Sequence, residues 1–218
     1  MREDRTGADD LPPVDRSATA RANAYYVLAR AFGRPDDWPE AFENLLRKTF
    51  AATDGEASAL VRRMLDSARD KQALSVDHAR LFLGPFEIQA APWASSYLDP
   101  EQRLMGPHSR YAAEAYAEAG LAPGGGPTDA PDHVTHELEF MYFLAFQEAT
   151  EDDRLWRERQ ERFWRQHLGH WLPSLAAAVG EAGSDSPFYA GLAGLTQAFC
   201  DREARHLGHG AANSTSLS

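Results

Sequence analysis

Apolar residues recur at helical spacing along most of this chain, and this periodicity constrains the fold more than any other feature. In residues 15–32 one face carries Ala22, Tyr25, Tyr26, Ala29 and Phe32. β-Branched residues are scarce, whereas alanine, leucine, glutamate and arginine are plentiful, and this composition favours helix nearly everywhere. We therefore predict an all-α fold.

The same spacing predicts about eight helices in a single globular domain. Their expected extents are about 15–32, 39–52, 56–68, 75–83, 108–122, 132–149, 154–171 and 186–206. Ser75 is the expected cap of the fourth helix, and Asp132 or Thr128 that of the sixth. Pro173 should kink or restart the seventh. Residues 138–146 are apolar on nearly every side, which is typical of a central buried helix.

Prolines interrupt the helical pattern between residues 84 and 107. They stand at positions 85, 92, 100 and 107, and this density forbids a continuous helix. The same segment holds the large apolar residues Phe86, Ile88, Trp93, Tyr97, Leu98 and Leu104. A merely solvated loop would be more polar, and loops of this length are usually functional or disordered. We expect this one to be ordered and functional.

Composition limits the compartment and the partners. The chain of 218 residues has one cysteine, Cys200, so an intrachain disulfide is impossible, which suits a reducing compartment. The first residues lack the apolar stretch of a signal peptide, and no apolar run is long enough to span a membrane. The net charge of −11 counts against nucleic-acid binding. These observations predict a cytoplasmic protein with 1–14 and 208–218 as flexible tails around a domain at 15–207.

Three His-x-x-His pairs could in principle hold a metal, at 133/136, 167/170 and 206/209. A di-metal helical bundle needs Glu-x-x-His, which does not occur here. Ser95-Ser96 lacks a nucleophile elbow, and the glycines at 124–126 are followed by no lysine. We therefore predict no catalytic residue, no metal and no cofactor. A metal-dependent helical enzyme and a generic helical scaffold remain the alternatives.

Residues 78–99, HARLFLGPFEIQAAPWASSYLD, resemble the signature of the TorD/DmsD family of redox-enzyme maturation chaperones. The matching residues are Leu81, Phe82, Gly84, Pro92, Ser95 and Tyr97. A second family block is matched by Pro131, Asp132 and His133, followed by the stretch ELEFM at 137–141. A third stretch that resembles the family pattern is HLGHWLP at 167–173. His78 and Ala94 depart from the family pattern, where an aromatic residue and a glutamate are commoner.

The resemblance implies a cytoplasmic, all-helical, non-enzymatic chaperone. Family members bind the twin-arginine signal peptide of a molybdenum-cofactor oxidoreductase, its apo-subunit, or both, and delay export until the cofactor is loaded. The expected partners are thus a twin-arginine leader and an apo-catalytic subunit, with neither nucleic acid nor membrane insertion, for a monomer or a domain-swapped dimer. The client enzyme, the oligomeric state and guanine-nucleotide binding stay open.

A twin-arginine leader is a basic segment followed by an apolar one, so its receptor needs an apolar groove near acidic groups. We expect the peptide-binding residues to be Leu81, Phe82, Gly84, Pro92, Trp93, Ser95, Tyr97, Asp132 and His133. Trp93 and Tyr97 would form the groove wall, Asp132 would contact a leader arginine, and His133 would fix the loop or hold the peptide. The alternative is that Trp93 fills the core and Asp132 caps its helix.

Overall fold

The computed structural model describes residues 16–50, 55–84, 88–101, 105–122, 130–151 and 153–208. The expected tails, 1–14 and 208–218, lie outside this part of the chain, except for Gly208 at the end of the last helix. Within the described part, the secondary structure consists of helices and one isolated pair of bridged residues, so the all-α prediction is confirmed.

The helices of the described residues have the following bounds. The α-helices are α1 (Arg16–Phe32), α2 (Phe42–Phe50), α3 (Gly55–Ser67), α4 (Lys71–His78), α5 (Ser95–Leu98), α6 (Pro107–Glu118), α7 (Val134–Thr150), α8 (Arg154–Phe163), α9 (Gly169–Ala182) and α10 (Pro187–Gly208). Three short segments with tighter or wider turns are η1 (Pro35–Asp37), η2 (Ala79–Leu83) and η3 (Trp164–Leu168).

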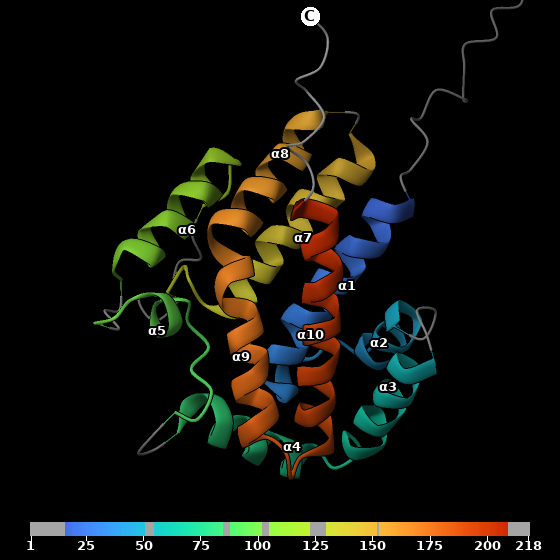
Figure 1. Cartoon of the computed structure of the whole chain (residues 1–218). Coiled ribbons are helices and arrows are strands. Elements are labelled where there is room, and N and C mark those ends of the chain that lie inside the picture. Colours follow the sequence, from blue (N-terminus) through green and yellow to red (C-terminus); the bar gives the residue numbers. More distant parts are fainter. Residues whose placement is uncertain are drawn as a thin grey trace, which may run out of the picture.

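The core lies where two pairs of long helices meet. Helix α1 runs along α7, α9 runs along α10, and α3 covers another side of α10 (Figure 1). Their facing side chains, among them Tyr25, Leu28, Met141 and Trp171, are fully buried. Burying one such side chain stabilises the fold by about 1.5–3 kcal/mol, and truncating it to alanine costs about 2–5 kcal/mol.

Two helix starts differ from the expected ones. The side chain of Asp70 accepts a hydrogen bond from the backbone N–H of Ala73 (2.9 Å), so α4 begins one turn before the predicted cap, Ser75, which lies inside the helix. Helix α7 is capped by His133, whose Nδ1 accepts the backbone N–H of Thr135 (3.3 Å). The predicted cap, Asp132, therefore has another role, and Thr128 lies outside the described residues.

The change from regular α-helix lies just before Pro173, where the sequence predicts a kink or restart. Helix α8, the wide turn η3 and α9 follow one another without a gap, and Pro173 lies inside α9. Proline has no backbone N–H, so it cannot donate a hydrogen bond to the carbonyl four residues earlier. Here that carbonyl belongs to Gly169, at the start of α9. The departure from regular α-helix is at η3, where wider turns accommodate an extra residue.

Helix α7 is buried on only part of its surface. Leu138, Met141 and Leu144 are fully buried, but Tyr142 and Phe143 are half-buried and Phe146 is 46% exposed. The expectation of a helix buried on nearly every side is therefore wrong for one face, because α1 and α6 leave a gap there that other side chains do not fill.

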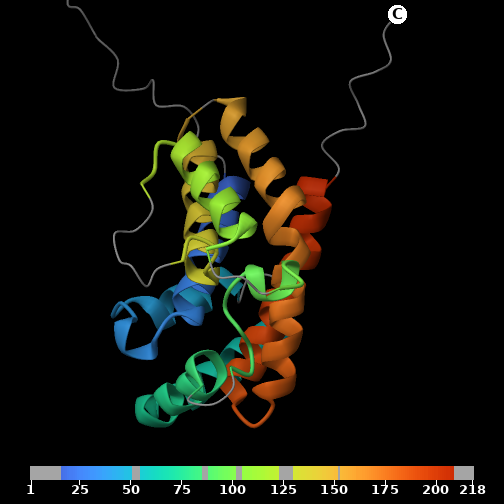
Figure 2. The ribbon, with the colours of Figure 1, turned by 90° about the vertical axis from the view of Figure 1, so that its left-hand side faces the viewer.

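The proline-rich segment follows a defined path where the structure describes it. The backbone N–H of Ala90 donates to the carbonyl of Leu81 (2.9 Å), and the chain then runs along α9 to the single turn of α5 (Figure 2). Trp93 and His133 form the isolated antiparallel bridge, with N–H···O distances of 2.9 Å from Ala94 to Asp132 and 2.8 Å from Val134 to Pro92. The two sequence blocks thus meet.

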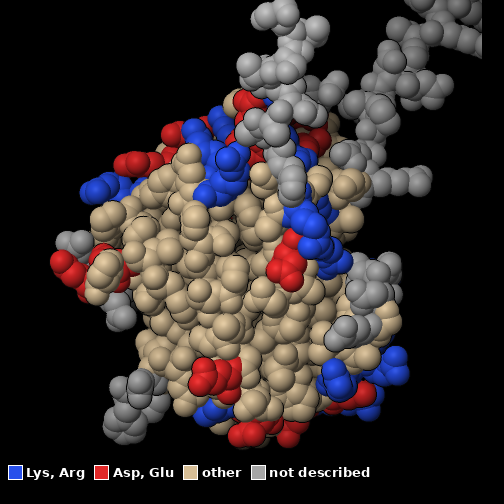
Figure 3. Space-filling view, in the orientation of Figure 1, with Lys and Arg blue, Asp and Glu red and all other residues tan. Residues whose placement is uncertain are grey.

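In the view of Figure 3, charged side chains gather toward the two ends of the bundle, and uncharged residues cover the middle, over α9 and α10. None of the helices in the described ranges is both long enough and apolar enough to cross a membrane.

Candidate functional site

Asp132 joins three segments from a fully buried position. One carboxylate oxygen accepts the backbone N–H of Ser95 (3.0 Å), and the other accepts the hydroxyl of Ser109 in α6 (2.6 Å). Its side chain has no exposed surface. A ligand cannot reach it in this conformation, so the expected direct contact between Asp132 and a leader arginine is not supported. Asp132 instead fixes α5, α6 and the start of α7 relative to one another.

A row of aromatic rings begins beside this buried carboxylate. The ring centroids of Trp93 and His133 are 5.8 Å apart, and those of His133 and His136 are 5.7 Å apart. Nδ1 of His136 lies 3.1 Å from the carbonyl oxygen of Ala130 and, because a carbonyl only accepts, must carry the proton. Trp93 and His133 are half-buried. The row leads from the proline-rich segment to a cavity.

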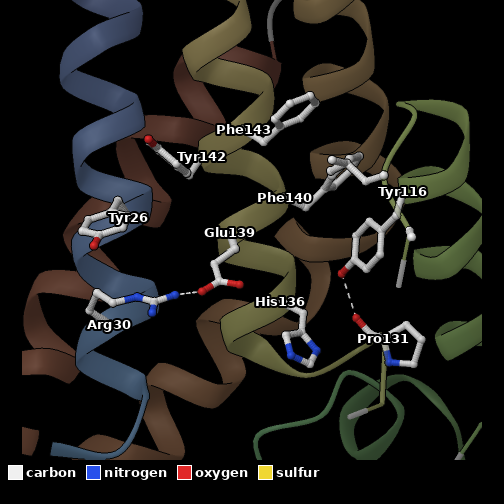
Figure 4. A pocket seen from close by; sticks show the side chains of 11 residues that line it. Tyr26, Arg30, Tyr116, Pro131, His136, Glu139, Phe140, Tyr142 and Phe143 are labelled. Carbon is white, nitrogen blue, oxygen red and sulfur yellow. Dashed lines mark hydrogen bonds and ion pairs between the residues drawn. The ribbon is translucent and has the colours of Figure 1, made fainter. Parts of the chain in front are cut away.

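The cavity has a volume of about 490 Å³ and lies between α1, the end of α6 and α7 (Figure 4). Its walls are mainly aromatic and aliphatic, with one ion pair between Arg30 and Glu139. The lining residues are Tyr26, Arg30, Tyr116, Leu121, Ala122, Pro131, His136, Glu139, Phe140, Tyr142 and Phe143. The hydroxyl of Tyr116 donates to the carbonyl of Pro131 (2.7 Å), which ties the end of α6 to the Pro-Asp-His segment.

A smaller cavity of about 160 Å³ adjoins the first. Arg30, His136 and Glu139 line both, and Asp37 and Trp38 contribute to the smaller one. Together the two cavities form a groove, which we call the α1–α7 groove. An apolar groove with a few placed polar groups is the usual form of a binding site for a peptide or small ligand.

Several residues of the first sequence block do not line this groove. Leu81 and Phe82 are buried, and the Phe82 ring lies 5.7 Å from that of Tyr189. Gly84 has φ 33° at the end of η2, a value that favours glycine. Ser95 is buried beside Asp132. The burial of Leu81, Phe82 and Ser95 does not support the prediction that they line an accessible groove.

Tyr97 and Pro92 also lie away from the cavity. The Tyr97 ring stacks on that of Trp171 with centroids 5.8 Å apart, and burial raises the pKa of its hydroxyl to about 12. Pro92 is buried, and its carbonyl accepts the N–H of Val134. Of the nine expected residues, His133 has its ring beside that of the lining residue His136, and the Trp93 ring lies beside that of His133.

None of the nine expected residues is among the eleven that line the larger cavity; the missed residues that matter most below are Tyr26, Arg30, Glu139, Tyr142 and Phe143. Two signals were present. The stretch 138–146 carries more aromatic residues than one helix can bury against its neighbours, and Tyr26 lies beside the buried Tyr25 on α1. What the sequence does not show is that these two faces stand opposite each other.

The histidine pairs serve other purposes in the described residues. Nε2 of His167 lies 2.6 Å from one carboxylate oxygen of Glu137, and the other oxygen accepts the indole N–H of Trp171 (2.9 Å). Burial raises the pKa of Glu137, although His167 opposes that shift. His170 donates to the carbonyl of Arg165, and His209 lies outside the described residues. Within these ranges, no group of three or more histidine, cysteine or acidic side chains could hold a metal ion.

The fold and the groove define an all-helical protein whose candidate site is suited to binding. The comparison with known families agrees with the sequence resemblance: the chain belongs to the TorD/DmsD family of redox-enzyme maturation chaperones, and the family model described as "Nitrate reductase delta subunit" matches residues 47–177.

Individual relatives support this assignment. A chaperone protein TorD from Shewanella sp. (strain MR-4) is 27% identical over 86% of this chain and 94% of its own length. A Tat proofreading chaperone DmsD from Salmonella typhi is 30% identical over 66% of each chain. The crystal structure of a putative redox enzyme maturation protein from Archaeoglobus fulgidus aligns with a TM-score of 0.54 at 21% identity, covering 92% of this chain and 99% of that one. This last likeness concerns the fold.

Proposed function

We propose that this protein is a cytoplasmic maturation chaperone that binds the twin-arginine leader, the apo form, or both, of a molybdenum-cofactor oxidoreductase subunit. Binding aids cofactor insertion and delays export until the cofactor is loaded. Its relatives are named as chaperones and as a proofreading chaperone of the Tat system, which supports this role over catalysis.

The α1–α7 groove is the observation that carries the proposal. It is apolar along most of its length, with the rings of Tyr142, Phe143 and Phe140 on α7 and that of Tyr26 on α1. Its larger cavity reaches Pro131 and His136, on either side of the Asp132–His133 pair of the second family block. An extended or helical apolar segment can place its side chains between such rings, and aromatic anchors supply most of the energy in peptide grooves.

The contributions of the predicted site residues follow from their positions. Trp93 and His133 extend the row of rings beyond the groove, where they contact the part of the peptide that leaves it. Asp132 and Ser95 hold this row in place through the bonds already described. Leu81, Phe82, Gly84, Pro92 and Tyr97 keep the proline-rich segment against α9 and the core.

The proposal is tested by isothermal titration calorimetry with a synthetic peptide that carries an Arg-Arg pair followed by a run of leucine and alanine. The wild-type protein should bind this peptide and reject a scrambled version of the same composition. Phe143→Ala should weaken binding about tenfold or more, because an aromatic anchor lost from a groove commonly costs over 1.4 kcal/mol. Phe146→Ala, one turn further on the same helix and outside the groove, is the matched control.

Equal binding of the two peptides would favour a general helical scaffold and contradict the proposal. If a folded Phe143→Ala variant binds the peptide as tightly as wild type, the peptide-binding site lies outside the groove.

A further inference from the structure

Arg30 occupies the α1–α7 groove in the manner of a bound ligand. Its guanidinium is paired with the carboxylate of Glu139, and its central carbon lies 5.4 Å from the centroid of the Tyr26 ring (Figure 4). The Tyr26 ring in turn lies 5.3 Å from that of Tyr142 on the opposite helix. A carboxylate next to an aromatic face is an arrangement that binds a guanidinium well, since the group pairs in its plane and stacks on its face.

The contacts of Arg30 are nevertheless incomplete. Its Nε is buried and has no hydrogen-bond partner among the residues that the structure describes. The side chains of Arg30 and Glu139 are 30% and 40% exposed, so water weakens their attraction. A buried donor without a partner is unfavourable, so replacement of Arg30 by another group costs little.

The groove also offers Arg30 a place to move. The smaller cavity is lined by Arg30 and Glu139 together with Asp37, an exposed residue of η1 that provides a second carboxylate. A rotation of the Arg30 side chain about its own bonds could carry the guanidinium into this space. Glu139 would then be free to accept a cation from outside, and Arg30 would share the carboxylate of Asp37 with Arg34, which also lines this cavity.

We infer that Arg30 is an internal placeholder, and that an arginine of the bound peptide replaces it on Glu139 and against the Tyr26 ring. This inference rests on the proposed function and specifies its ligand, a peptide in which arginine adjoins apolar residues. Glu139 thereby takes the role that the sequence assigned to Asp132, which is buried and already bonded on both oxygens.

The exchange makes the groove selective for arginine over lysine. A lysine ammonium can pair with Glu139 but lacks the flat guanidinium that lies against an aromatic ring and donates from several positions. The apolar residues of the peptide would occupy the rest of the groove, along Phe140 and Phe143. The resident pair also keeps Glu139 from taking up cations that bring no apolar segment with them.

The test is calorimetry of three variants with the Arg-Arg peptide and with its Lys-Lys counterpart. Glu139→Gln should weaken binding of the Arg-Arg peptide about tenfold, the loss expected for one charged contact. Arg30→Gln should do the opposite and tighten binding severalfold, because the competing guanidinium is gone. In the double variant the gain should vanish, since Arg30→Gln helps only while Glu139 is present. Wild type should prefer arginine to lysine.

Removal of any positive charge favours a basic peptide to some extent, so Arg62→Gln on α3, outside the groove, is the matched control. The unfolding free energy of each variant should stay within about 1 kcal/mol of wild type, which shows that every variant folds. Weaker or unchanged binding by Arg30→Gln, or an Arg62→Gln variant that gains as much, would overturn the placeholder role while leaving the proposed function standing. Absence of binding by the wild-type protein would refute both.

Discussion

Arg21 and Arg30 lie on the same helix and are both paired with glutamate, yet their surroundings differ in almost every respect. Nine residues correspond to two and a half helical turns, so the two side chains leave α1 on opposite sides. Arg21 is 9% exposed, and its nitrogens donate to Glu203 (2.9 and 2.8 Å), Glu148 (3.1 Å) and Gln160 (2.7 Å). Arg30 faces the groove with a single carboxylate and a buried Nε that has no hydrogen-bond partner among the described residues.

The network of Arg21 fixes the end of the bundle where four helices meet. Glu203 of α10 also accepts the hydroxyl of Tyr25 (2.6 Å), and Gln160 of α8 donates to Glu148 of α7 (2.8 Å). Burial by itself lowers the pKa of Arg21. The hydrogen bond to Glu203 and the nearby carboxylates raise it by more than burial lowers it, so the net shift is upward. The comparison separates a buried arginine–glutamate pair with complete hydrogen bonds, as a structural role requires, from a half-exposed pair with incomplete hydrogen bonds, as the proposed exchange requires.

The largest effect should come from Arg21→Met. This change leaves Glu203 buried without its cation, and breaking a buried pair in this way costs about 3–5 kcal/mol of unfolding free energy. Arg30→Met should cost less than about 1 kcal/mol, because its pair is exposed to water. Urea unfolding followed by circular dichroism measures both. Equal losses for the two variants would remove the distinction between them.

A smaller effect is expected at Asp132, which resembles Arg21 in burial and in complete bonding. Asp132→Ala leaves the N–H of Ser95 and the hydroxyl of Ser109 without their acceptor, at a cost of about 1–3 kcal/mol for a buried group. It should also weaken binding of the Arg-Arg peptide indirectly, through misplaced Trp93 and His133.

Ser109→Ala should show the same effects more weakly, although Ser109 does not line the groove. Asp201→Ala, an exposed acidic residue of α10, is the control. If the Asp132→Ala variant has normal stability but no longer binds the peptide, this result would instead support a direct contact between Asp132 and the peptide.

The smallest effect concerns pH and the edge of the Arg21 network. Nε2 of His206 accepts a hydrogen bond from Arg157 (2.7 Å), and burial, Arg21 and Arg157 lower the pKa of its ring below the usual 6.5. The unfolded chain therefore binds more protons in this range, so unfolding free energy should fall as pH decreases below about 6.5. His206→Gln, whose amide oxygen can accept the same bond, should reduce this slope. Urea unfolding at several pH values measures the slope of unfolding free energy against pH. A slope for His206→Gln equal to or steeper than that of wild type would contradict this role of His206.

The sequence predicts the positions of the helices but only part of the candidate site. Apolar spacing predicts α1 and α10 nearly to the residue, because it reflects a local periodicity. The two sequence blocks meet at the bridge between Trp93 and His133. The groove could not be predicted, because its walls come from residues 26–30, 116–122 and 131–143, which only the tertiary fold brings together.

The roles of individual polar residues were hidden for the same reason. Arg21 and Glu203 are 182 residues apart in the chain, and no local pattern pairs them. Asp132 stands at a helix start, where either a cap or a ligand contact is reasonable, and its burial depends on Ser95 and Ser109 from two other segments.

The most direct test of the binding site is photo-crosslinking of the Arg-Arg peptide to protein that carries benzoylphenylalanine at a chosen position. Substitution at Tyr142, in the wall of the α1–α7 groove, should give a crosslink that the unlabelled peptide competes away. The same label at Ala198, exposed on α10, should give none. A competed crosslink at Ala198 with none at Tyr142 would place the peptide on the other side of the molecule and contradict the account.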